Sequence, residues 1–133
     1  MKYTLPKPEL LRGRETFKYI ITSGNKLIEK NIVCFYIIET CTPEEQPLKV
    51  GFSVGVKVGK AVLRNRIKRL MRECYRLNKH SLIETAISNN LQIRTVFMFI
   101  TNKISVPKKI SYNEIAQTMV KLMHQIKNFL TVK

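Results

Sequence analysis

Apolar residues recur at three- and four-residue intervals near both ends of the chain, and this is the spacing of an amphipathic helix. In the N-terminal part, Phe17, Ile20 and Ile21 fall on one face and predict a helix over Arg14–Ser23. Gly24 follows directly and supplies a helix stop. A first helix with one apolar face is therefore expected before any strand.

The C-terminal part carries a second pattern of the same kind. Ser111 and Glu114 have the spacing of a capping box, in which each side chain bonds the free backbone N–H of the other residue. The helix that this box would open has one apolar stripe, formed by Ile115, Met119, Leu122, Ile126 and Phe129.

Three segments between these helices have strand patterns. Residues 32–38 form a continuous run of β-branched, aromatic and other apolar residues, which favours a strand buried on both faces. In Leu48–Val54 apolar residues alternate with polar residues and glycine, so one face should be buried. Residues 42–47 contain two prolines and predict a turn, so we expect these two strands to form a hairpin. Residues 95–100 predict a further strand.

A third helix is predicted over residues 61–79, with an apolar side formed by Leu63, Ile67, Leu70, Cys74 and Leu77. Residues 80–92 have the weakest pattern, and we expect a helical extension followed by a loop at Asn89 and Asn90. The order helix, strands, helix, strand, helix predicts an α+β fold with helices packed on a mainly antiparallel sheet. A length of 133 residues suits one domain, residues 1–133.

The charge of the chain narrows the class of partner. Lys and Arg number 24 against nine acids, all of them Glu, which gives a net charge of +15. Such an excess favours nucleic acid or an anionic membrane surface as partner. The longest apolar run is only residues 32–38, far short of the roughly 20 residues that span a bilayer, and the N-terminus has no apolar core of a secretory signal. We therefore expect a cytoplasmic protein without a membrane partner.

The cysteines support the same compartment. Cys34, Cys41 and Cys74 are odd in number, widely spaced and without a C-x-x-C pair. This pattern favours reduced thiols over a disulfide framework or a zinc site.

The cations are most concentrated on the predicted helix over residues 61–79. From Lys57 to Lys79 there are nine Lys or Arg residues and one acid, Glu73. The polar side of the helix carries Arg64, Asn65, Lys68, Arg69, Arg72 and Arg76, and Arg66 falls at the edge of the apolar side, where we expect it to pack in part. A face that only needs to be soluble mixes Glu with Lys, because like charges one turn apart cost stability. A polyanion-binding face is therefore the better interpretation, since clustered cations release counterions from a nucleic acid backbone.

Two further features suit phosphate binding. Arginine predominates over lysine on this helix, and a planar guanidinium grips phosphate with two parallel hydrogen bonds. Gly55 and Gly59 precede the helix and would let the backbone approach a phosphate closely. The glycine pattern is weak by itself, and it is not a Walker P-loop.

The segment Val58-Gly59-Lys60-Ala61-Val62, followed by Arg64-Asn65-Arg66-Ile67-Lys68-Arg69, resembles the signature of the bacterial ribonuclease P protein component. In that family a strand ends in Ser-Val-Ser-Lys-Lys, and a Val-Gly-x-Ala-Val turn leads into Arg-Asn-Arg-x-Lys-Arg on a helix. The segment from Leu11 to Gly24 also resembles the opening helix of the family. The resemblance covers nearly the whole chain, although beyond about Arg76 it concerns only the order of elements.

The resemblance implies a fold and two RNA-binding surfaces. The fold would be an α/β sandwich like the second domain of a small ribosomal subunit protein, with a left-handed βαβ crossover. One surface would meet the catalytic RNA of ribonuclease P through Lys60, Arg64, Asn65, Arg66, Lys68, Arg69 and Arg72. The other would be a cleft for the single-stranded 5′ leader of precursor tRNA, lined by Arg12, Phe17, Phe35 and Lys57. Aromatic faces can stack on unpaired bases, although an ordinary core position is the more common fate of any single Phe.

The sequence departs from the family pattern at three positions. Ile21 stands where a second aromatic is common, Val56 replaces one cation beside the cleft, and Lys60 stands where Asn is frequent. These departures bear on the contacts to the leader.

The residue types argue against catalysis by the chain itself. Hydrolysis of a phosphodiester by a protein usually needs clustered carboxylates for two metal ions, or a pair of histidines. The chain has no Asp, and His80 and His124 are far apart in sequence. We therefore expect no catalytic or metal-ligating residue and no cofactor on the protein. The resemblance implies that Mg²⁺ and the hydrolysis belong to the RNA subunit, bound one to one by the protein.

Two other classes share the charge. A structural RNA-binding protein of ribosomal type would need no leader cleft. A helix-turn-helix DNA-binding protein is disfavoured, because strands precede the basic helix.

Overall fold

The computed structural model describes residues 9–40, 46–100 and 112–131, which contain four helices, four strands and a short 3₁₀ turn (Val56–Val58). Along the chain the elements are α1 (Arg14–Ser23), β1 (Asn25–Glu29), β2 (Ile32–Thr40), β3 (Leu48–Val54), α2 (Ala61–Asn78), α3 (His80–Ser88), β4 (Leu91–Phe99) and α4 (Tyr112–Thr131). The predicted α+β class is confirmed.

The sheet has the strand order β1-β2-β4-β3. β2 is antiparallel to both of its neighbours, whereas β3 and β4 are parallel and are connected through α2 and α3. This connection is a βαβ crossover between parallel strands. The predicted hairpin between residues 32–38 and Leu48–Val54 is wrong, because β4 lies between the two strands.

The error has a physical cause in β2. A strand with apolar residues on both faces is typical of the interior of a sheet, and it needs a partner along each edge. β1 occupies one edge through a two-residue turn at Lys30 and Asn31, with Lys30 in the left-handed region (φ 51°). β4 occupies the other edge, so β3 has to pair beyond it. β1 escaped prediction because it is short, and three of its five residues are exposed.

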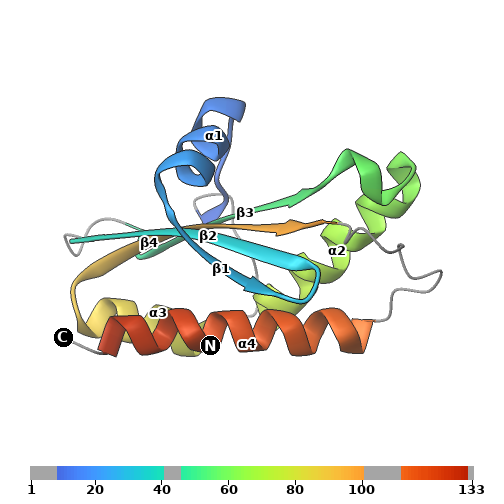
Figure 1. The fold of residues 1–133 in the computed structure, drawn as a ribbon. Helices are drawn as coiled ribbons and strands as arrows, with labels where there is room; N and C mark the ends of the chain where they lie inside the picture. Colours follow the sequence, from blue (N-terminus) through green and yellow to red (C-terminus); the bar gives the residue numbers. More distant parts are fainter. Residues whose placement is uncertain (1–8, 41–45, 101–111, 132–133) are drawn as a thin grey trace.

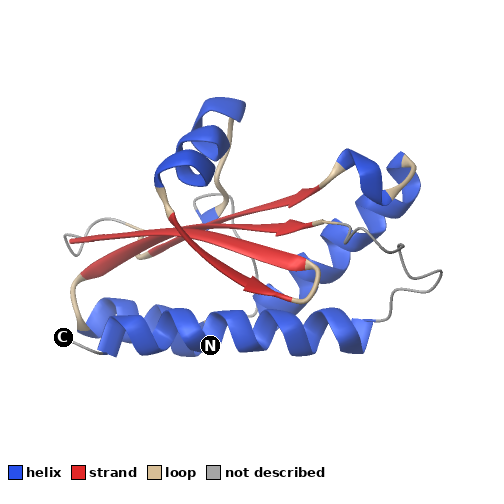
Figure 2. Cartoon of the chain, viewed as in Figure 1, coloured by secondary structure: helices blue, strands red, loops and turns tan. Residues whose placement is uncertain are grey.

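The helices cover the two faces of the sheet unequally (Figures 1 and 2). On one face of the sheet, side chains of α2, α3 and α4 pack against the strands and form a large core. In the described ranges the other face carries α1 alone, over a small cluster of Leu11, Ile20 and Val96, with Phe17, Phe35 and Ile37 partly buried around it. We call this second side the open face, because a single ten-residue helix covers it.

Most predicted helix bounds agree with the structure. α1 has the predicted bounds, α2 ends one residue early at Asn78, and α3 followed by a turn fills the uncertain segment. β4 begins at Leu91, four residues before the predicted strand. The predicted capping box involves Ser111, which lies outside the described residues.

The apolar side of α2 is rotated from its predicted position. The structure buries Ile67, Met71, Cys74 and Tyr75, whereas Leu77 is 41% exposed. The cause is tertiary, since the ring of Tyr75 packs between β3 and β4, with its centroid 5.8 Å from Phe52 and 6.0 Å from Phe97. With this rotation Arg66 is exposed, and its predicted partial packing is wrong.

A similar shift occurs at the end of α4. Four of the five predicted stripe residues are buried, but Phe129 is 51% exposed and stacks on Tyr36 at 5.9 Å between ring centroids. Leu130 takes the core position instead.

The rotation of α2 makes a prediction for stability. Met71→Ala empties a fully buried position and should lower the free energy of unfolding by about 2–5 kcal/mol. Leu77→Ala, on the same helix, should cost less than about 1 kcal/mol because that side chain is largely in water. Urea unfolding followed by circular dichroism measures both, and a larger loss for Leu77→Ala would contradict the observed orientation of α2.

Candidate nucleic-acid interface

A cavity of about 610 Å³ lies where α1, β3 and α2 meet, and we call it the basic cleft. One wall is the N-terminal arm (residues 10–13) together with Phe17 of α1. The floor is the middle of β3, at Val50, Gly51 and Phe52. The opposite wall is α2, which contributes Asn65, Lys68, Arg69 and Arg72.

The α2 wall is cationic because of helical spacing. Asn65, Arg69 and Arg72 are four and three residues apart and share one side of the helix, while Ile67 and Met71 point into the core. Lys68 lines the cleft beside them, and all four lining side chains of α2 are exposed. Among the described residues, no carboxylate lines this cleft to offset their charge. The wall is therefore suited to an anion such as a phosphate backbone.

The floor of the cleft is shaped by Gly51. A Cβ at this position would lie 2.4 Å from Cζ of Phe17, so only glycine lets the Phe17 ring lie directly on the strand. Phe17 is half-buried against the cluster of Leu11 and Ile20, and it also lines the cleft. The sequence left open whether Phe17 is a core residue or a cleft residue. In the structure its ring packs against the core and also lines the cleft.

The N-terminal arm is attached to the free edge of β3. Leu10 forms a parallel bridge with Val50, and the Leu11 N–H donates to the Val50 carbonyl at 2.8 Å. Gly13 then adopts a φ of 92°, which a side chain would disfavour, and the chain turns into α1. This path places the exposed side chain of Arg12 in the cleft, across from α2.

Six of the residues predicted from the sequence therefore come together in one cleft: Arg12, Phe17, Asn65, Lys68, Arg69 and Arg72. The two surfaces that were expected separately share this cavity. Sequence reasoning missed Gly13 and Gly51. For Gly51 the available signal was a glycine inside a strand pattern.

The other predicted residues lie outside the basic cleft. Phe35 is half-buried in the cluster beneath α1, next to Val96 in the sheet register. Lys57, Lys60 and Arg66 are exposed at the 3₁₀ turn and on α2, where they extend the positive surface. The Arg64 Nε donates to the Gly59 carbonyl at 3.1 Å, so this side chain also fastens the turn before α2.

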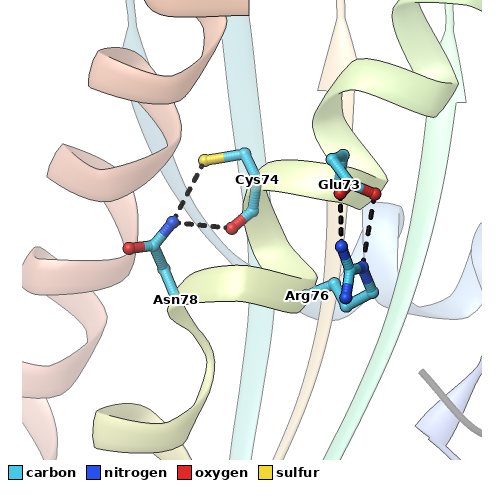
Figure 3. A network of polar contacts seen from close by, with 4 residues as sticks. All are labelled: Glu73, Cys74, Arg76 and Asn78. Carbon is cyan, nitrogen blue, oxygen red and sulfur yellow. Dashed lines mark hydrogen bonds and ion pairs between the residues drawn. The ribbon is translucent and has the colours of Figure 1, made fainter. Parts of the chain in front are cut away.

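The cationic surface of α2 weakens after Arg72. Figure 3 shows Arg76 facing Glu73, with its Nε donating to Oε2 at 3.2 Å. This hydrogen bond is the main reason that the pKa of the Glu73 carboxyl lies below its usual value. Because Glu73 offsets the charge of Arg76, the last turn of α2 contributes less to the positive surface than the turns facing the cleft.

The described thiols are poor nucleophiles. Burial raises the pKa of Cys34 to about 12 and that of Cys74 to about 11, although hydrogen bonds between Cys34 and Thr95 and between Cys74 and Asn78 oppose the shift. In Figure 3 the Asn78 amide reaches both the Cys74 carbonyl, at 2.8 Å, and the sulfur, at 3.6 Å. At neutral pH both cysteines are protonated.

The part of the chain that the structure describes contains no group of three or more His, Cys, Asp or Glu side chains arranged to hold a metal ion. Within the same ranges, no helix has the length and apolar character needed to cross a membrane.

Comparisons with known proteins agree with each other. A family model described as ribonuclease P matches residues 5–127. The ribonuclease P protein component of Chlorobaculum tepidum is 32% identical over 136 residues, covering 96% of this chain and 83% of the relative. The ribonuclease P protein component of Petrotoga mobilis is 32% identical over 125 residues, covering 92% of this chain and 95% of the relative. In fold, the chain is similar to the ribonuclease P protein from Thermotoga maritima, with a TM-score of 0.67, 24% identity, and coverage of 88% of this chain and 96% of the other.

Proposed function

Since the chain belongs to the ribonuclease P protein family, we propose that its basic cleft holds the single-stranded 5′ leader of precursor tRNA while the cationic side of α2, which forms one wall of the cleft, binds the catalytic RNA. Membership in the family implies RNA binding, association with the ribonuclease P RNA and a role in tRNA processing. The finer assignment of the leader to the cleft rests on the chemistry of its walls.

The observation that supports this assignment most is the pairing of cations with an aromatic ring across one cavity. Lys68, Arg69 and Arg72 form one wall, and Phe17 faces the same space from the other. Single-stranded nucleic acid is bound without sequence preference by this combination, in which cations follow the backbone and a ring stacks on a base. Each stacked base contributes about 1–3 kcal/mol.

The proposed division of labour leaves hydrolysis to the RNA. The chain has 24 cations and no Asp, and its nine Glu residues are scattered along the sequence. These residues can shield the repulsion between two RNA molecules and orient the leader, whereas two-metal hydrolysis needs clustered carboxylates. We further propose that one protein binds one catalytic RNA in the cytoplasm and that Mg²⁺ is held by the RNA.

The cationic wall predicts a change in the salt dependence of binding. Arg69→Ala should weaken affinity for the catalytic RNA and precursor tRNA, and should flatten the slope of log K against log salt by about one unit. Titrations at several KCl concentrations measure this slope. Arg76→Ala is the matched control on the same helix, and it should change the slope less because Arg76 is paired with Glu73. Equal slopes for wild type and Arg69→Ala would remove Arg69 from the interface.

The aromatic wall predicts a dependence on the leader. Phe17→Leu keeps an apolar side chain over Gly51 but removes the aromatic face, so affinity for precursor tRNA should fall about fivefold or more. Affinity for tRNA without a leader should not change. Phe129→Leu is the control, because Phe129 is an exposed aromatic stacked on Tyr36 and does not line the cleft. A loss that is the same with and without the leader would assign Phe17 to the core alone.

A further inference from the structure

A buried ion pair joins the two walls of the basic cleft. The Lys79 ammonium lies 2.9 Å and 2.8 Å from the two carboxylate oxygens of Glu9. The side chains are only 3% and 5% exposed, although the residues are 70 positions apart in sequence. The other ion pairs among the described residues have at least one partner that is 46% exposed or more.

The position of this pair connects it to the cleft. Lys79 directly follows α2, the helix that carries the cationic wall. Glu9 directly precedes the arm that bridges to Val50 and delivers Arg12 to the opposite wall. The pair therefore links the start of the N-terminal arm to the C-terminal end of α2.

The surroundings of the pair are costly for a charge. Burial, and then the charge of Glu9, raise the pKa of the Tyr75 hydroxyl well above its ordinary value. The Tyr75 hydroxyl is buried, and no hydrogen-bond partner for it lies among the described residues. The Glu9 carboxylate and the Lys79 ammonium are thus removed from water, and the buried Tyr75 hydroxyl beside them in the core is neutral.

Stability alone does not account for such an arrangement. Removing two ions from water costs several kcal/mol per ion, and an apolar pair of similar volume is often equally stable or more stable. What an ion pair adds is a defined geometry, because an ammonium held by both carboxylate oxygens cannot slide as two apolar side chains can. The geometry fixed here is the separation between the N-terminal arm and α2.

We propose that Glu9 and Lys79 are positioning residues that set the width of the basic cleft, so that Arg12 and the α2 cations contact the same strand of nucleic acid. This inference rests on the proposed function, in which the cleft holds the leader. A pre-set spacing reduces the ordering cost of binding, and its loss appears as weaker binding of the leader rather than as unfolding.

The test compares two doubly substituted proteins. Glu9→Met with Lys79→Met removes the buried pair without changing net charge. Glu29→Met with Lys121→Met is the matched control, since this pair, 3.2 Å apart, joins β1 to α4 away from the cleft. Each protein is reconstituted with a bacterial ribonuclease P RNA, and its affinity is measured for precursor tRNA and for tRNA without a leader. The ratio of the two affinities is the leader contribution.

The buried-pair variant should unfold at a urea concentration equal to or above that of wild type, yet its leader contribution should fall about fivefold. The control should keep the wild-type ratio. Hydrogen exchange gives a readout independent of RNA, because the Leu11 N–H should lose protection while the Ile93 N–H, bonded to the Pro47 carbonyl, should not.

A folded buried-pair variant with an unchanged leader contribution and a protected Leu11 N–H would overturn the positioning role, while the proposed function would stand. A wild-type protein without any leader contribution would overturn both. If the double variant does not fold, Glu9→Gln with Lys79→Gln, which removes both charges and keeps polar side chains that can bond each other, is measured in the same two ways, with Glu29→Gln and Lys121→Gln as its control.

Discussion

The concentration of like charge on one helix is the constraint on which the rest of the structure depends. α2 carries its cations on one side and anchors the other side in the core through Ile67, Met71 and Tyr75. Neighbouring cations on a helix repel each other, and among the described residues of α2 only Glu73 offsets them. Such a helix is stable because its apolar side is buried. Its charged side can bind a polyanion, and this binding is favoured because it releases the counterions condensed on the polyanion.

The sheet supplies the second half of the site. Among the described residues, three helices cover one face of the sheet and only α1 covers the other (Figure 1). On that side the basic cleft lies beside β3. The N-terminal arm closes the cleft from one side and α2 from the other, so the cleft is a product of tertiary packing. Gly51 decides how deeply Phe17 sits in it. The same arrangement explains why cations from α2 and an aromatic residue from α1 face one cavity.

Much of the fold and of the cleft could be predicted from the sequence, because strong local patterns dominate the chain. The structure contains α1, β2 and α2 where the sequence pattern predicts them, with the cations of α2 on its exposed side. The misses have tertiary causes. Tyr75 displaced Leu77 from the core because an aromatic cluster forms with Phe52 and Phe97, and periodicity alone cannot weigh such a contact. β4 came between β2 and β3 because pairing depends on both edges of a central strand, and the Glu9–Lys79 pair spans a distance in sequence that no local pattern covers.

The central claim is that this protein binds RNA while the catalytic RNA cleaves the phosphodiester bond. The most direct measurement is release of the 5′ leader from precursor tRNA at low Mg²⁺, with the protein alone, with a bacterial ribonuclease P RNA alone, and with both together. The account predicts no release by the protein alone and stimulated release by the combination. Leader release by the protein without RNA, or no stimulation of the RNA at any protein concentration, would contradict it.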